Sequence, residues 1–99
     1  MFREVLQEIL DRTEGCKGVV IMGFDGIAVE RVWHNDVTDS NYDITVAEYT
    51  SLVRNTKQKN SDTGAGKLDE MTISNENELF IMRLVSDDYF IAMILEMAQ

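Results

Sequence analysis

Hydrophobic residues recur with a helical spacing at the start of the chain. Over residues 2–13, apolar side chains fall at the i, i+3, i+4 and i+7 positions of one face, and charged or polar residues fill the other face. This spacing predicts an amphipathic helix. Gly15 follows as a plausible stop, because glycine adopts a left-handed cap without steric cost. The apolar face comprises Phe2, Val5, Leu6, Ile9 and Leu10.

A pair of strands joined by a tight turn is predicted next. Residues 19–22 are all apolar, which is typical of a strand covered on both faces. The dipeptide Asp25-Gly26 is a strong hairpin signal. Residues 27–32 alternate between apolar and polar side chains, and this more polar pattern is typical of an edge strand. The polar, acidic segment 33–43 then predicts a loop.

A second helix is predicted over residues 45–60, and its apolar side chains do not form one stripe. Val46, Tyr49 and Val53 line one side, whereas Ile44 and Ala47 lie nearly opposite, with Leu52 between the two sides. A helix with two apolar sides requires two neighbours, of which one is its own sheet and the other could be another chain. The helix gives way to a polar segment that is rich in turn-forming residues.

Three further strands are predicted at 67–74, 79–85 and 89–95. The most apolar of these, the last, is expected at the centre of the sheet, flanked by the first and fourth strands, with the second and third at the edges. The predicted fold class is therefore α+β, with a five-stranded antiparallel sheet covered by helices in the order α-β-β-α-β-β-β. Residues 1–99 form one domain of ordinary size.

Charge and composition exclude several kinds of partner. The chain has 18 acidic and 9 basic residues, so its formal net charge is −9. This balance argues against binding to nucleic acid and to anionic membrane surfaces. A single cysteine cannot form an internal disulfide, which favours the cytoplasm. No apolar run approaches the roughly 20 residues of a membrane span, so we expect no membrane insertion.

Two strings resemble ligand-binding loops and fail on inspection. Residues 64–67, Gly-Ala-Gly-Lys, resemble the end of a phosphate-binding loop, but Ser61 and Leu68 stand where that loop needs Gly and Ser or Thr. Asp39, Asn41 and Asp43 match the first three ligands of a calcium loop, but the later glycine and the bidentate glutamate are lacking. A turn and a solvated acidic loop are the better interpretations. We therefore expect no cofactor and no metal.

The residues that could serve as a nucleophile or base are too few to form a catalytic site. Cys16 is the one cysteine and His34 the one histidine, so a metal cluster or a Cys-His pair lacks partners. Cys16 is better interpreted as a small residue at the edge of the core. The sequence contains no cluster of acid, base and nucleophile of the kind that would indicate an enzyme.

Several short strings, taken in order, resemble those of one known family. They cover nearly the whole chain and are specific in combination. They are 18–22 and 25–29 in the first hairpin, 47–54 in the second helix, 66–73 in the third strand, and 79–83 and 88–92 in the last two strands. These residues resemble the Roadblock / dynein light chain domain family, especially its small bacterial single-domain members.

The resemblance implies a non-enzymatic homodimer. In that family the third strands of two chains pair antiparallel, and the second helices lie side by side across the joined sheet. This agrees with the edge character of the third strand and the two-sided second helix. The implied dimer interface comprises Val46, Tyr49, Thr50 and Val53 of the helix and Leu68, Glu70, Met71, Thr72 and Ile73 of the strand.

The resemblance further implies a module that binds and regulates a small Ras-like GTPase on the paired helices. We expect Arg54, Lys57 and Gln58 to face such a partner. Alternatives are a nucleotide-independent dimeric scaffold for signalling or motility proteins and, third, a small-ligand sensor domain. Family members usually end with a helix after the fifth strand, whereas this sequence stops at Gln99. Without that helix, an apolar patch is expected on one face of the sheet.

Overall fold

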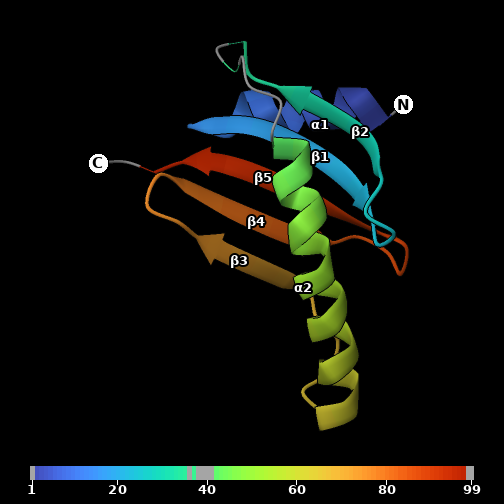
Figure 1. Ribbon diagram of the computed structural model, residues 1–99. Helices are drawn as coiled ribbons and strands as arrows, with labels where there is room; N and C mark the ends of the chain where they lie inside the picture. Colours follow the sequence, from blue (N-terminus) through green and yellow to red (C-terminus); the bar gives the residue numbers. More distant parts are fainter. Residues whose placement is uncertain (1, 36, 38–41, 98–99) are drawn as a thin grey trace.

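The protein forms a single sheet with a helix on each face. The structure is a computed structural model and describes residues 2–35, 37 and 42–97. Figure 1 shows α1 and α2 on opposite faces of the sheet, with α2 crossing the strands. The elements are α1 (Phe2–Arg12), β1 (Cys16–Gly23), β2 (Ala28–Trp33), α2 (Tyr42–Thr63), β3 (Glu70–Ser74), β4 (Glu78–Leu84) and β5 (Tyr89–Glu96).

The sheet has five strands in the order β2-β1-β5-β4-β3, and all neighbouring pairs are antiparallel. This order confirms the predicted α+β fold, with β5 at the centre and with β2 and β3 at the edges. The most apolar strand, β5, thus lies between β1 and β4, away from both edges of the sheet. The calcium-like residues Asp39 and Asn41 lie outside the described residues.

The second helix is longer than predicted, and the third strand is shorter. The helix continues to Thr63, because the polar residues that precede Thr63 are compatible with a helical backbone. Gly64 is the first residue outside the helix. Gly64 and Gly66 have positive φ angles of 75° and 96°, which L side chains rarely adopt. The chain reverses through these two glycines, so residues 67 and 68 precede the strand, and Asp69 joins the ladder only through its C=O, which accepts from Leu84 N–H.

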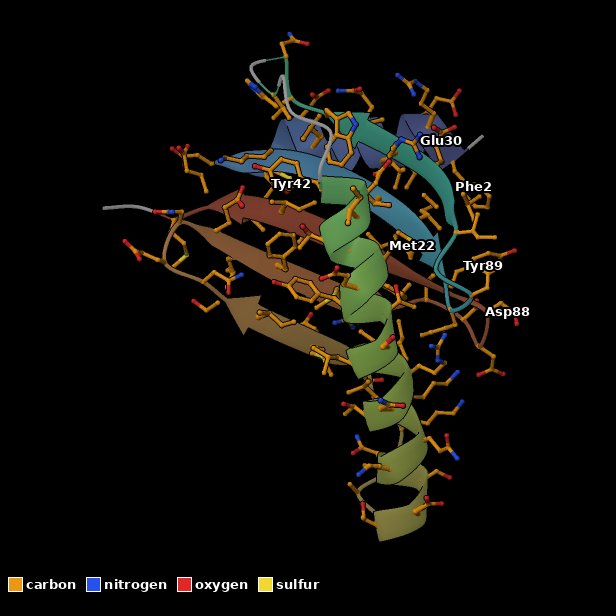
Figure 2. The ribbon with its side chains drawn as sticks, viewed as in Figure 1. Phe2, Met22, Glu30, Tyr42, Asp88 and Tyr89 are labelled. Atoms are coloured by element: carbon orange, nitrogen blue, oxygen red, sulfur yellow. The ribbon has the colours of Figure 1, made fainter. Side chains whose placement is uncertain are left out.

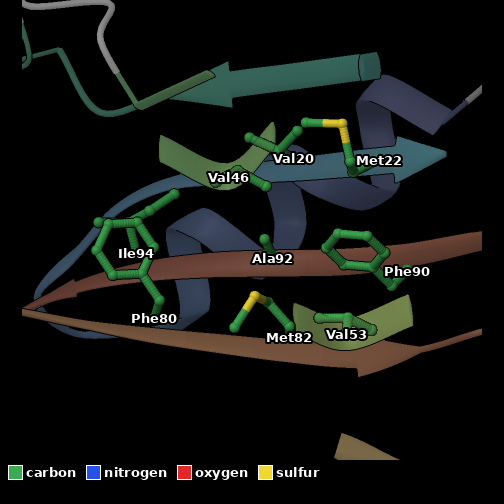
Figure 3. Close-up of a cluster of buried hydrophobic side chains, with 9 residues drawn as sticks. All are labelled: Val20, Met22, Val46, Val53, Phe80, Met82, Phe90, Ala92 and Ile94. Atoms are coloured by element: carbon green, nitrogen blue, oxygen red, sulfur yellow. The ribbon is translucent and has the colours of Figure 1, made fainter. Parts of the chain in front are cut away.

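The larger hydrophobic cluster lies between α2 and the sheet. Val46 and Val53 of α2 rest on side chains from β1, β4 and β5, and Figure 3 shows the two valines above the strands. Burial of this apolar surface is the main force that holds α2 on the sheet. The buried members are Val20, Met22, Val46, Val53, Phe80, Met82, Phe90, Ala92 and Ile94.

The opposite face is only partly covered. Leu6 and Leu10 of α1 pack on a second buried cluster that includes Val19 and Val32, so α1 lies over β1 and β2. Figure 1 shows the helix behind this half of the sheet. On the other half of the same face, half-buried apolar side chains have no helix above them in the described part of the chain. These are Leu79, Ile81, Ile91, Met93 and Leu95.

Candidate interaction surface on β3 and α2

The outer side of β3 presents free backbone groups. Leu84 N–H donates to Asp69 O at 2.9 Å, and Asn75 N–H donates to Glu78 O at 2.9 Å. Backbone groups in an antiparallel ladder face the neighbour at every second residue. In this register residues 69, 71, 73 and 75 therefore bond to β4. It follows that Glu70, Thr72 and Ser74 direct their N–H and C=O groups away from the sheet.

The other edge of the sheet is obstructed. The pairing of β1 with β2 has an irregularity between Ile21 and Met22, which disturbs a straight edge. Arg31 of β2 is satisfied locally, because its N–H donates to Glu30 Oε1 at 3.1 Å and its C=O accepts from Arg3 Nη1 at 3.4 Å. Such devices protect an edge from pairing. The regular edge open to another strand is therefore β3.

Three of the predicted interface residues lie in the core of the chain itself. Val46 and Val53 are 0% exposed and Thr50 is 1% exposed. The Thr50 hydroxyl donates to Val46 O at 3.0 Å, which satisfies it within the helix. These three side chains pack against their own sheet, so any helix contact with a second chain has to come from other positions.

The other predicted interface residues gather along β3 and the adjoining side of α2. Tyr49 lies edge-on to Phe80, with ring centroids 5.1 Å apart, and its hydroxyl accepts from Asn75 Nδ2 at 3.3 Å. Leu68, Met71 and Ile73 are half-buried and pack against the core cluster from the same side.

Glu70 and Thr72 are exposed and lie on the opposite face of β3 from Met71 and Ile73. Glu70 forms an ion pair with Arg83, at 3.2 Å. The structure thus divides the predicted strand residues between the two faces of the sheet, as the alternation of a strand requires.

Two of the predicted partner-binding residues of α2 are held by turns of the sheet. The Arg54 guanidinium donates to Phe24 O in the β1–β2 turn. Lys57 Nζ donates to Asp87 O in the β4–β5 turn at 3.1 Å and lies 4.5 Å from the centre of the Phe24 ring. The third predicted residue, Gln58, is exposed. Arg54 and Lys57 therefore also fix the direction of α2.

The C-terminal half of α2 projects past β3. Figure 1 shows the helix continuing beyond the last strand of the sheet, and Figure 2 shows the side chains that this part of the helix carries. No residue of the helix after Val53 is buried. Between this overhang and the sheet lies an open groove of about 810 Å³, lined by Lys57, Lys67, Leu68 and Leu84 among others. A helix of this length has more surface than its own sheet covers.

Two apolar residues on the outer side of α2, Ile44 and Leu52, belong to the second apolar side that the sequence indicated, but sequence reasoning assigned neither of them to a site. Ile44 is 61% exposed and Leu52 is 50% exposed. Residues eight apart fall on about the same face of a helix, so the two side chains share one stripe. The two-sided apolar pattern contained the signal, but it did not show which side meets the sheet. These residues are candidates for contact with a partner.

A polar cluster anchors the start of α2. The Tyr42 hydroxyl donates to Glu78 Oε2, and Lys17 Nζ donates to the same oxygen at 3.2 Å. Burial raises the pKa of Tyr42, and the hydrogen bond to Glu78 acts in the same direction. Burial alone lowers the pKa of Lys17, but its hydrogen bonds to Glu78 and Tyr42 outweigh this effect and raise that pKa.

Stability is expected to fall above about pH 10 because of this cluster. Both raised pKa values mean that the folded state keeps its protons to a higher pH than the unfolded state, so the free energy of unfolding decreases as pH rises from the unfolded pKa values through the higher folded ones. Urea unfolding at several alkaline pH values measures the slope. Glu78→Gln should make the free energy of unfolding fall less steeply with pH. An identical slope in the wild type and the variant would show that this cluster does not cause the alkaline loss of stability.

Neither described helix is long and apolar enough to cross a membrane. In the ranges that the structure describes, no group of three His, Cys, Asp or Glu residues is placed to hold a metal ion.

The cysteine predicted at the edge of the core, Cys16, is buried beside α1, and burial raises the pKa of its thiol. The candidate surface therefore offers backbone edges, apolar side chains and charges for contact with other chains.

Comparison with known proteins agrees with this geometry. A Roadblock/LC7 domain model matches residues 2–95. MglC from Myxococcus xanthus is 32% identical with a TM-score of 0.67, and the match covers 96% of this chain and 79% of MglC. The gliding protein MglB from Thermus thermophilus has a TM-score of 0.82 at 14% identity, over 95% of this chain and 70% of that chain.

A Roadblock/LC7 domain from Streptomyces avermitilis is similar at a TM-score of 0.78 and 12% identity, over 94% of this chain and 76% of that chain. No curated protein sequence matches the chain. The family model covers both helices and all but the last residue of the sheet, and MglC adds substantial identity over the same length. The chain therefore belongs to the Roadblock/LC7 domain family, as its sequence strings predicted.

Proposed function

We propose that the protein is a cytoplasmic, non-enzymatic homodimer that binds and regulates a small Ras-like GTPase. The observation that supports this most strongly is the combination of an open β3 edge with a helix that projects beyond it. The family's pairing of third strands would use this edge, and the paired second helices would form the surface for the GTPase.

The geometry of the single chain is suited to such a dimer. Antiparallel pairing about a two-fold axis at Thr72, the middle residue of β3, would join the outward N–H and C=O groups of two chains. The 22 residues of α2 span about 33 Å, whereas four strand spacings span about 19 Å. The overhanging half of α2 would then lie over the partner's sheet and cover apolar surface there.

The outer stripe of α2 is the surface that we assign to the GTPase. Ile44 and Leu52 remain exposed on it, and neither is needed by the core. We expect such a surface to act by contact with the partner. Arg54, Lys57 and Gln58 stay predicted partner contacts, although Arg54 and Lys57 also reach turns of the sheet.

Affinity capture with purified protein tests this function. The bait is offered to lysate of the source organism, with a non-hydrolysable GTP analogue in one arm and GDP in the other. We expect a Ras-like GTPase to be enriched in the GTP arm. Leu52→Asp, a change at an exposed position, should remove the GTPase while the bait keeps its dimer mass.

The outcomes separate the alternatives. Equal recovery of one partner in both arms would favour a nucleotide-independent scaffold, and motility proteins are then the first partners to consider, since one similar structure is described as a gliding protein. Absence of a GTPase from both arms would contradict the regulator, and specific retention of a small molecule would favour the sensor.

A further inference from the structure

The sheet face that α1 leaves uncovered is an apolar floor. Ile91 and Met93 of β5 point to this face and pack at the border of the cluster beneath α1. Leu79 and Ile81 of β4 pair with Leu95 and Met93, so they share the same face. All of these side chains are half-buried although no helix lies over them in the described ranges. The floor extends from α1 to β3.

One flank of α1 forms a wall beside this floor. Leu6 and Leu10 point into the sheet, and Arg3 reaches Glu30 of β2 at 3.5 Å, which fixes the side of the helix that faces β2. Helical geometry then directs the opposite flank toward β5. That flank carries Phe2, Val5 and Ile9, of which Phe2 is 52% and Val5 is 53% exposed.

Floor and wall together have the dimensions of a seat for one helix. Helices pack with axes about 8–10 Å apart, and two strand spacings measure about 10 Å. A second helix beside α1, which lies over β1 and β2, would therefore lie over β5 and β4. It would contact the α1 flank with one side and the sheet with another. An extended peptide would leave much of this apolar surface uncovered.

The charges around the seat favour a basic occupant. Glu14 and Glu76 lie in turns at one end of the strands, and Asp88 lies in the turn at the other end. The two nearby arginines are neutralised, since Arg12 pairs with Glu8 at 3.0 Å and Arg83 pairs with Glu70 at 3.2 Å. The whole chain carries a formal net charge of −9.

We propose that the seat between the α1 flank and the β5–β4 floor binds an amphipathic helix of a partner protein, with an apolar stripe toward the sheet and basic residues around it. The apolar stripe would cover Ile81 and Met93, and the basic ends would meet the acidic turns. This proposal does not rest on the β3 dimer or on GTPase binding, because the seat lies on the face opposite α2.

A designed probe peptide tests the seat directly. The probe has about fourteen residues, or ~21 Å of helix, with leucine at helical spacing and lysine elsewhere. One control peptide carries the same residues in scrambled order, and the other has glutamate in place of every lysine. Fluorescence anisotropy measures the dissociation constant for the wild type, Val5→Lys, Ile81→Lys and Ile44→Lys. Circular dichroism confirms that each variant is folded.

The wild type should bind the striped basic probe, and both control peptides should bind at least about tenfold more weakly. Val5→Lys and Ile81→Lys should weaken binding by a similar factor. Ile44→Lys, which adds the same charge on α2, should leave it unchanged. Absence of binding, equal binding of the scrambled peptide, or indifference to Val5→Lys would overturn the proposal. The proposal would also be overturned if sedimentation showed that Val5→Lys dissociates a higher oligomer of the wild type, because a second copy of the chain would then occupy the seat.

Discussion

Val53→Asp is expected to remove at least about 3–5 kcal/mol of the protein's stability. Val53 is 0% exposed and lies in the cluster between α2 and the sheet, where it has no charged partner in the described contacts. A carboxylate there loses its hydration, and the substitution also leaves a gap in the core. The combined cost is at least about 3–5 kcal/mol, against a total stability of about 5–15 kcal/mol for a domain. Urea unfolding followed by circular dichroism measures the loss.

Leu52→Asp is the matched control, because Leu52 is the preceding residue of the same helix and is 50% exposed. Its free energy of unfolding should change by less than about 1 kcal/mol. If the free energy of unfolding fell equally in the two variants, Val53 would not lie on the side of α2 that faces the sheet. The orientation of the helix would then have to be revised.

Thr72→Pro is expected to separate the proposed dimer and leave the single chain folded. The Thr72 N–H points away from β4, so proline removes no hydrogen bond within the chain and is tolerated at an edge strand. In the dimer the same change removes two inter-chain bonds by symmetry and places two rings in the seam. The dimer dissociation constant should rise at least about tenfold. Sedimentation over a range of concentrations measures it.

Thr72→Ala keeps the N–H and serves as the control. It should retain the dimer, because strand pairing uses the backbone. A Thr72→Pro protein that dimerises as tightly as the wild type would place the interface elsewhere, and a Thr72→Ala protein that dissociates would assign the effect to the side chain.

The order of the strands could be predicted because burial leaves a direct mark on a strand's sequence. The all-apolar character of β5 indicated a strand at the centre of the sheet, and the alternation in 27–32 indicated an edge. The end of α2 was misplaced, because exposed polar residues are compatible with both a helix and a loop. Only Gly64, with its φ of 75°, fixes the stop.

The candidate site was harder to predict, because it depends on contacts between distant residues. The sequence showed two apolar sides on the second helix, but the position of the sheet decides that Val46 is buried and Ile44 is exposed. Protection of the β2 edge depends on Arg3, which reaches Arg31 from a helix 28 residues away along the chain. No local pattern reveals such a contact.

Amide hydrogen exchange along β3 tests the central claim most directly. In the single chain the amides of Met71 and Ile73 bond to β4, whereas the Thr72 amide points outward and should exchange rapidly. In a β3-paired dimer all three are bonded. We predict that the Thr72 amide of the wild type is protected as strongly as its two neighbours at concentrations where the dimer forms. Rapid exchange at Thr72 between two protected neighbours would contradict the dimer through β3.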